Sequence, residues 1–237
     1  MKNMMTQNKG SKMLLKAKKL NDGHDHGDEE EDDSAPQATK MIMLPQDDDS
    51  RMIGLFGEVE ENKAAQLIGM MFDLAEEAEV ETEEEVGEGE EKKVEVKTEI
   101  LPIEFLLSTP GGSADDMFAI YDVMRVVKEK CPIQTFGLGK VMSAGVLLLA
   151  AGTKGQRKIG KNCRVMIHSV IGGTSGSFHN LENEMEEMRY MQEAYLKALS
   201  DESNLSVAQL KRMINRKVNV YLSAEEAVKM GIADIIV

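Results

Sequence analysis

The sequence predicts an α/β protein with helices layered on a parallel sheet. Short apolar segments at 52–56, 103–108 and 133–138 have the length of buried strands. The segments 60–75 and 113–131, which separate them, carry apolar residues at helical spacing. Strands that alternate with helices form parallel sheets, because each connection has to cross back over the sheet.

The same alternation continues towards the C-terminus. The elements expected there are a helix of small residues at 143–151, a strand or turn near 157–159, a strand at 164–168, a long helix at about 180–201, further helices at 206–214 and 223–231, and a last strand at 232–237. Ser223 and Glu226 have the spacing of a capping box, so they define the start of the last helix. The long helix carries an apolar stripe formed by Leu181, Met185, Met188, Met191, Tyr195 and Leu199.

The net charge of −14 is concentrated outside the core segments. Residues 21–50 hold eleven acidic residues against one lysine, and residues 75–100 hold twelve glutamates against three lysines. Residues 101–237 hold fifteen acids and sixteen bases, so this part is nearly neutral. No basic patch with interleaved aromatic residues accompanies the core segments, which argues against a nucleic-acid-binding surface.

Residues 1–40 join a lysine-rich start to an acidic run and are expected to form a disordered arm. His24 and His26 could bind a metal there, but a solvated tail is the simpler interpretation. Cys131 and Cys163 are too few for a disulfide framework and are expected to be reduced. No apolar run reaches the ~18 residues of a membrane span, so a cytoplasmic protein is expected.

The glutamate-rich segment 76–99 interrupts the alternation between the first helix and the strand at 103–108. We expect a surface insertion, either a charged flexible excursion or an extended hairpin.

Ser143 is the first candidate for chemistry. It stands at the head of a helix of small residues, where free N–H groups and a partial positive charge are directed. These groups would stabilise a serine nucleophile and a tetrahedral oxyanion. The alternative role is a helix N-cap. The motif is not the G-x-S-x-G turn of α/β-hydrolases, because residue 141 is valine.

Two further candidates also follow strands. Gly111 and Gly112 come after the strand at 103–108, and adjacent glycines let the backbone approach a ligand, although a tight turn alone would also use them. His168 ends the strand at 164–168, either as a partly buried structural residue or as a general base. Loops at the ends of successive α/β strands are the usual place for active sites, so these residues and Ser143 together predict one site.

Four separated segments resemble the Clp protease family, and they occur in the family's order. They are STPGGSADDMFAIYDVM (108–124), GLGKVMSAGVLLLAAGTKGQR (137–157), CRVMIHSVIGG (163–173) and YLSAEEAVKMGIAD (221–234), with a weaker match at 51–74. The resemblance implies a ClpP-like peptidase domain over 41–237, built on the β-α-β superhelix shared with crotonases, with the long helix as its handle. It also implies a homo-oligomer of stacked rings, with an AAA+ unfoldase or paralogous Clp subunits as candidate partners and no cofactor or metal.

The resemblance further implies a serine endopeptidase that cleaves peptides or unfolded proteins inside the chamber of the rings. Ser143 would be the nucleophile and His168 the general base. The implied oxyanion hole consists of the N–H groups of Gly111 and Ala144, and the implied lining of the extended substrate is Gly112, Gly172 and Gly173.

The third triad position departs from the family, which has an aspartate where this chain has Asn219. An amide oxygen can still orient His168, but it brings no negative charge to the imidazolium. A slow Ser-His-Asn peptidase, a carboxylate supplied from elsewhere, and a subunit with little activity all remain open. The alternative functions are therefore a structural subunit of a mixed ring and, less favoured because Ser143 and His168 together suit acyl transfer, a crotonase-like acyl-CoA enzyme.

Overall fold

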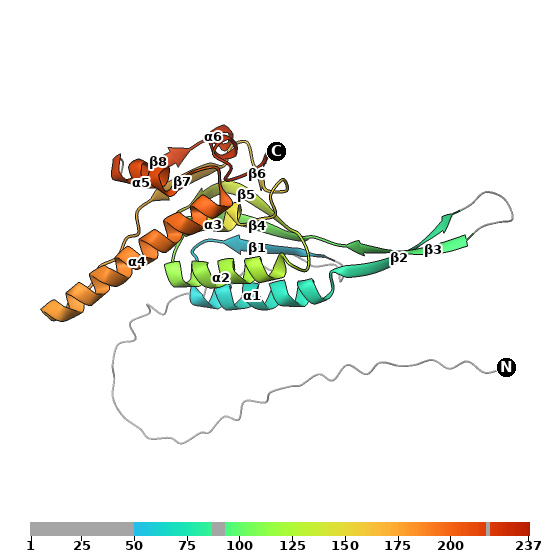
Figure 1. Cartoon of the computed structure of the whole chain (residues 1–237), viewed down its shortest axis with the longest axis horizontal. Coiled ribbons are helices and arrows are strands. Elements are labelled where there is room, and N and C mark those ends of the chain that lie inside the picture. The colour runs from blue at the N-terminus through green and yellow to red at the C-terminus, as the bar shows by residue number, and fades with distance from the viewer. Residues whose placement is uncertain (1–49, 87–92, 217–218) are drawn as a thin grey trace, which may run out of the picture. The chain divides into compact units, whose positions relative to one another are not determined.

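The computed structural model describes residues 50–86, 93–216 and 219–237 (Figure 1). The predicted disordered arm at 1–40, the metal hypothesis for His24 and His26, and the domain boundary at residue 41 lie outside these residues.

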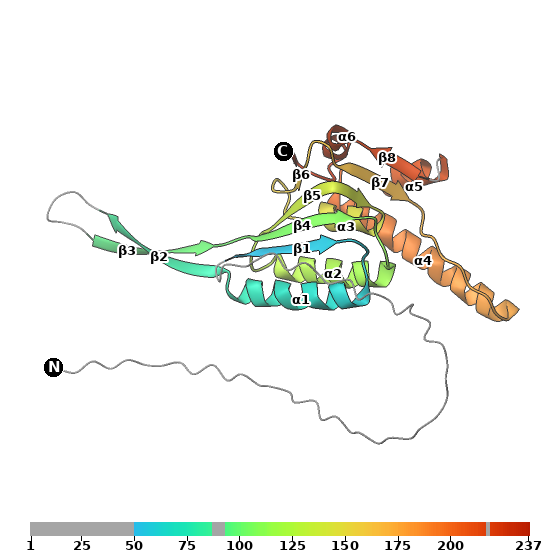
Figure 2. The same cartoon turned by 180° about the vertical axis from the view of Figure 1, so that it is seen from behind.

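A mainly parallel sheet forms the centre of the molecule and confirms the predicted α/β class (Figure 2). Its main path runs through β1 (Met52–Phe56), β4 (Ile103–Thr109), β5 (Ile133–Met142), β6 (Lys158–Ile159) and β9 (Ile235–Ile236), and all four pairings are parallel. The end of β5 pairs instead with β7 (Arg164–His168), also in parallel. Parallel strands end at the same edge, so the residues that follow β4, β5 and β7 come together there.

Strand β5 is longer than the segment 133–138 that the sequence predicted. The register against β4 shifts between Leu107, which faces Gly137, and Thr109, which faces Val141. Gly139 lies within the extra residues with a φ of 62°, a conformation that glycine adopts without a Cβ clash. The expected glycine turn is therefore a bulge inside the strand, and the strand continues to the residue before Ser143.

Strand β8 (Asn219–Leu222) was not predicted, and it runs antiparallel to β7. Its four residues are too short to give a clear alternation in the sequence. The register pairs Val165 with Leu222 and His168 with Asn219. The third candidate residue of the triad is thus directly opposite the second.

Three helices pack on one face of the sheet: α1 (Glu61–Glu76), α2 (Ala114–Val127) and α3 (Ala144–Ala150). Ser113 caps α2, because its hydroxyl accepts a hydrogen bond from the N–H of Asp116. Five residues of α2 follow each other at helical spacing on one face, and all of them are buried: Met117, Ile120, Tyr121, Met124 and Val127. The core therefore lies between these helices and the inward-facing residues of β4 and β5.

Helix α4 (Phe178–Glu202) is the long helix of the prediction, and its two halves differ. Its C-terminal half packs into the core through Tyr195 and Leu199. Its N-terminal half extends away from the sheet (Figure 1), and Leu181 and Met185 of the apolar stripe are exposed there. The stripe is thus core in one half and surface in the other.

The C-terminal elements are α5 (Val207–Arg216) and α6 (Ala224–Lys229). The predicted capping box at the start of α6 is present, with Ser223 and Glu226 each accepting a backbone hydrogen bond from the other. Cys131 and Cys163 are free and buried. The last strand, β9, has only two residues and is shorter than the predicted 232–237.

The glutamate-rich segment forms an antiparallel hairpin of β2 (Glu79–Val86) and β3 (Lys93–Ile100), so the hairpin alternative holds over its described residues. It extends away from the sheet and helices (Figure 1). Arg51 clamps its base, because its guanidinium donates hydrogen bonds to the carbonyls of Glu77 at 3.1 Å and Leu101 at 3.3 Å. Helix α1 extends to Glu76, and the hairpin begins at Glu79, three residues after the predicted start of the insertion.

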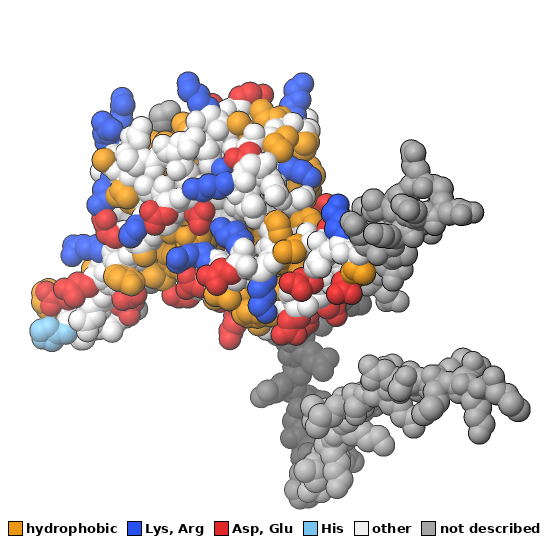
Figure 3. Space-filling model, turned by 45° about the vertical axis from the view of Figure 1, so that its right-hand side comes forward, with side chains coloured by type: hydrophobic (Ala, Val, Ile, Leu, Met, Phe, Trp, Pro, Cys, Tyr) orange, Lys and Arg blue, Asp and Glu red, His pale blue; other side chains and the backbone are white. Residues whose placement is uncertain are grey.

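The surface carries both charge signs. On the face in Figure 3, the Lys and Arg side chains are interspersed with Asp and Glu over the sheet and helices. Within the described residues, no helix is both long and apolar enough to cross a membrane.

Candidate active site

The turn between β4 and α2 holds both predicted glycines in conformations that favour glycine, with φ of 103° at Gly111 and 155° at Gly112. A Cβ on Gly111 would lie 2.5 Å from the Cβ of Ser143, and a Cβ on Gly112 would lie 2.2 Å from the carbonyl oxygen of Val59. Gly111 is therefore needed for the close approach of the Ser143 side chain, and Gly112 for the close approach of the Val59 backbone. The turn is held in place by hydrogen bonds from Val59 N–H to the Gly111 carbonyl and from Ser113 N–H to the Val59 carbonyl.

The N–H of Gly111, which was predicted to serve the oxyanion hole, already has a hydrogen-bond partner. This N–H donates to the hydroxyl of Thr109 at 3.0 Å, inside the protein. Thr109 is fully buried at the end of β4, so the bond is shielded from water. The next N–H in the turn belongs to Gly112, which is exposed and has no hydrogen-bond partner in the described part of the chain. The free donor of this turn is therefore Gly112.

Ser143 occupies a sharp turn between β5 and α3. Its φ of 54° and ψ of −122° make it the one non-glycine residue with positive φ in the described ranges. Such a conformation costs of order 1–3 kcal/mol and persists only where the surroundings hold it. Its N–H donates to the Met166 carbonyl at 2.8 Å, and its carbonyl accepts from Val146 N–H at 3.0 Å. It occupies the N-cap position of α3, but its side chain makes no capping hydrogen bond.

Gly145 brings α3 against the end of β4. A Cβ at this position would lie 2.4 Å from the Cγ2 of Thr109, so only glycine fits. Thr109 thus holds the glycine turn through its hydroxyl, and its methyl group packs against the start of α3. Ala144 is buried between these elements as the first residue of α3, where helical N–H groups have no partner within the helix.

His168 is the last residue of β7 and is partly buried. Burial disfavours the charged ring, and this lowers the pKa of His168 from its usual 6.5. The imidazole is therefore neutral at neutral pH, which is the form that can accept a proton. Burial is the cause of this pKa shift, and no described carboxylate adds to it.

Asn219 faces His168 across the β7–β8 pair and is exposed. Directly opposite residues in antiparallel strands have Cβ atoms about 4.5–5.5 Å apart, on the same side of the sheet. Among the described residues, no hydrogen bond joins the ring of His168 to Ser143 or to Asn219. The backbone thus brings the three residues together, while their side chains are not engaged with one another.

A pocket of about 370 Å³ connects the glycine turn, Ser143 and His168, whereas Asn219 does not line it. Its lining includes Gly112, Ser143, Ala144 and His168, and its apolar wall includes Met117 and Tyr195. Gly172 and Gly173 do not line it. Gly172 lies against Met188 of α4, and the pocket is lined on that side by Ser169, Val170 and Ile171, directly before the two glycines.

Two contributors to the site were missed in the sequence. Thr109 ends β4, in which alternate residues are buried. A polar residue at one of these inward positions was the signal that could have indicated its role. Tyr195 was assigned only to the apolar stripe, but its hydroxyl donates to the Ser143 carbonyl at 3.2 Å. No residue pattern indicates this contact, because 52 positions separate the two residues.

The fold and the pocket together define an α/β protein whose serine, neutral histidine and free N–H groups have the chemistry of acyl transfer. The Clp protease family matches residues 93–237, which is more than half of the chain. The chain belongs to this family.

Curated relatives agree with this membership. An ATP-dependent Clp protease proteolytic subunit 3 from Synechococcus sp. (strain CC9605) is 39% identical over 134 residues, which are 56% of this chain and 65% of the relative. An ATP-dependent Clp protease proteolytic subunit 1 from Salinibacter ruber is 35% identical over 133 residues, which are 56% of this chain and 55% of the relative. The matches thus span less than two thirds of these relatives.

Proposed function

We propose that the chain is a serine endopeptidase that cleaves peptides or unfolded proteins, acting as a subunit of an oligomeric ring in the cytoplasm. The observation that carries the proposal is the strained turn at Ser143, which lines one pocket together with an unpartnered glycine N–H and a neutral histidine. A strained serine beside free donors suits a nucleophile, since backbone strain concentrates at functional sites.

In this mechanism the Oγ of Ser143 attacks the peptide carbonyl, and His168 accepts the hydroxyl proton. The C–N bond then breaks as His168 returns that proton to the leaving amine. A water molecule hydrolyses the acyl-enzyme with His168 acting again as base. The hydroxyl–imidazole contact forms when substrate binds or subunits assemble, because catalytic hydrogen bonds in unliganded enzymes are often long and shorten in the complex.

The oxyanion hole in this proposal consists of the N–H groups of Gly112 and Ala144. Gly112 replaces Gly111, whose N–H is already bonded to Thr109. Both donors line the pocket with Ser143, as a hole for the oxyanion requires. One such donor is worth about 10²–10³ in turnover. The extended substrate would pass along Gly112 and the segment 169–173.

A fluorophosphonate probe tests the proposal. The serine oxygen displaces fluoride from phosphorus only if the hydroxyl is activated, so we expect the full-length protein to be labelled. Ser143→Ala should abolish labelling and peptide hydrolysis. Ser113→Ala is the matched control, because Ser113 also lines the pocket but caps α2. Equal labelling of the Ser143→Ala variant and the parent protein would refute the assignment.

A non-catalytic ring subunit is the second candidate, and Asn219 is the observation that favours it. Without a carboxylate beside His168, the imidazolium formed during attack is less stable. A protein that assembles into rings but is not labelled by the probe would be such a subunit.

We also propose that the β2–β3 hairpin obstructs the docking of an AAA+ unfoldase. The hairpin extends away from the sheet and helices, and Arg51 holds its base. Its described side chains are exposed, including Glu79, Glu81 and Val96. A charged projection of this kind would keep a partner from the adjoining surface.

Replacing residues 79–100 by Asn-Gly tests this idea. Leu101 N–H donates to the Ala78 carbonyl at 2.9 Å, which is the closing bond of a two-residue turn, so the variant keeps its base. We expect unfoldase-stimulated protein degradation to rise and cleavage of short peptides to stay constant. Stimulation equal to that of the parent protein would contradict the proposal.

A further inference from the structure

Helix α4 contacts the nucleophile turn directly through one polar side chain. The hydroxyl of Tyr195 donates a hydrogen bond to the carbonyl of Ser143 at 3.2 Å. Tyr195 is 6% exposed, and burial raises its pKa, so the hydroxyl keeps its proton as a donor. A buried tyrosine hydroxyl is costly without a partner, which means that this contact is maintained in the folded protein.

The carbonyl that Tyr195 holds belongs to the same peptide unit as the N–H of Ala144. The unit is planar and trans, since no cis peptide bond occurs in the described residues. In a trans unit the C=O and N–H point in opposite directions, so fixing the carbonyl also fixes the direction of the N–H. Ser143, which precedes this peptide unit, has strained backbone angles. Turning the unit over would change ψ of Ser143 and relieve that strain.

We infer that Tyr195 is a positioning residue for the oxyanion hole: together with the Val146 N–H, it holds the Ser143 carbonyl and so aims the Ala144 N–H at the carbonyl under attack. This inference rests on the proposed peptidase function and adds a residue that does not touch the reacting atoms. A second contact from the same helix accompanies it, because the side-chain oxygen of Gln192 accepts from the Val170 N–H at 3.3 Å, two residues after His168.

Tyr195→Phe removes the hydroxyl and keeps the ring that lines the pocket. We expect kcat for a short peptide to fall about tenfold or more, towards the 10²–10³ that one oxyanion donor is worth. KM should change little, because the ground-state carbonyl gains little from the N–H. Binding of a peptide boronate, which forms a tetrahedral adduct on the serine, should weaken in parallel with kcat.

Tyr121→Phe is the matched control. Tyr121 is also 6% exposed, and its hydroxyl also makes one 3.2 Å hydrogen bond, but to Glu202, the last residue of α4. Both variants should lose similar stability, while only Tyr195→Phe should lose turnover. Rates are divided by the concentration of active sites titrated with the fluorophosphonate, so that unfolded protein does not count.

The outcomes separate this inference from the proposed function. If the parent protein is neither labelled nor active, the peptidase proposal fails and takes the positioning role with it. If the parent is active and Tyr195→Phe matches Tyr121→Phe in kcat and in boronate affinity, the positioning role is wrong and the peptidase proposal stands. A loss confined to KM would also overturn the positioning role, because it would mark Tyr195 as a wall of the substrate pocket only.

Discussion

Asn219→Asp is expected to raise the turnover of peptide hydrolysis strongly, towards the factor of about 10⁴ that separates aspartate from asparagine in serine peptidases. The β7–β8 register sets residue 219 directly opposite His168, so the new carboxylate would lie beside the imidazole. A negative charge there stabilises the imidazolium that forms as Ser143 attacks. Steady-state kinetics of a fluorogenic peptide measure the effect.

The same substitution is expected to shift the pH profile. In the parent protein, burial lowers the pKa of His168 below 6.5, so the neutral base persists and kcat/KM should fall only at pH values below 6.5. A carboxylate beside the ring favours its charged form and raises its pKa, which moves the acid limb of the profile to higher pH.

Asn215→Asp is the control for added charge, because Asn215 is exposed on α5 and is not paired with His168. It should leave both turnover and the pH profile unchanged. A flat or lower rate in Asn219→Asp would mean that residue 219 does not serve His168, or that a group from another subunit already does.

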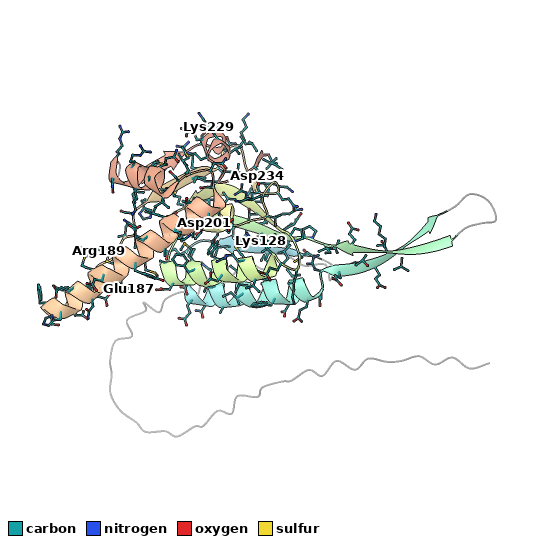
Figure 4. The ribbon with its side chains drawn as sticks, in the orientation of Figure 1. Lys128, Glu187, Arg189, Asp201, Lys229 and Asp234 are labelled. Carbon is teal, nitrogen blue, oxygen red and sulfur yellow. The ribbon has the colours of Figure 1, made fainter. Side chains whose placement is uncertain are left out.

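Arg157→Ala is expected to lower the free energy of unfolding by about 3 kcal/mol or more, because it leaves a partly buried carboxylate without its partner. The guanidinium of Arg157 makes two hydrogen bonds to Asp234, at 2.8 and 2.6 Å, and it donates to the carbonyls of Ala150 and Glu202. It thereby joins the C-terminal ends of α3 and α4 to the segment that leads into β9. In Figure 4 the labelled Asp201 lies near the C-terminal end of α4, and the labelled Asp234 lies directly before β9.

Thermal unfolding at fixed protein concentration measures this loss, expected as a decrease in Tm of roughly 10 °C. Arg157→Lys should recover only part of it, because an ammonium lacks the planar fork. Arg212→Ala, an exposed arginine on α5, should change the free energy of unfolding by no more than about 0.5 kcal/mol. A decrease for Arg157→Ala as small as that of Arg212→Ala would contradict the expectation.

Acid should weaken the same ion pair. Burial by itself would raise the pKa of Asp234, but the hydrogen bonds and charge of Arg157 outweigh it and hold the pKa below 3.8. A group with a depressed folded pKa stabilises the protein above its unfolded pKa and loses that contribution as the pH falls through the folded value. The contribution should therefore be complete above about pH 5 and be lost progressively as the pH falls below about 4.

Much of the architecture was determined by local patterns. The five buried residues of α2, the capping box of Ser223 and Glu226, and the strand at Met52–Phe56 follow from periodicity and capping chemistry. These patterns can be recognised in the sequence because each one depends on neighbours within a few residues. That the histidine at a strand end and the serine at a helix start line one pocket also follows from the order of the elements.

What the tertiary structure alone decided were the contacts between distant residues. The choice between Gly111 and Gly112 as donor depends on which N–H the Thr109 hydroxyl occupies, and a glycine pair in a sequence does not distinguish its two N–H groups. Strand β8, and with it the position of Asn219 opposite His168, is defined by its pairing with β7. The hydrogen bond from Tyr195 to Ser143 joins residues 52 positions apart. Hydrogen bonds of this kind depend on the orientation of single peptide units, which residue types along a chain do not encode and which only packing determines.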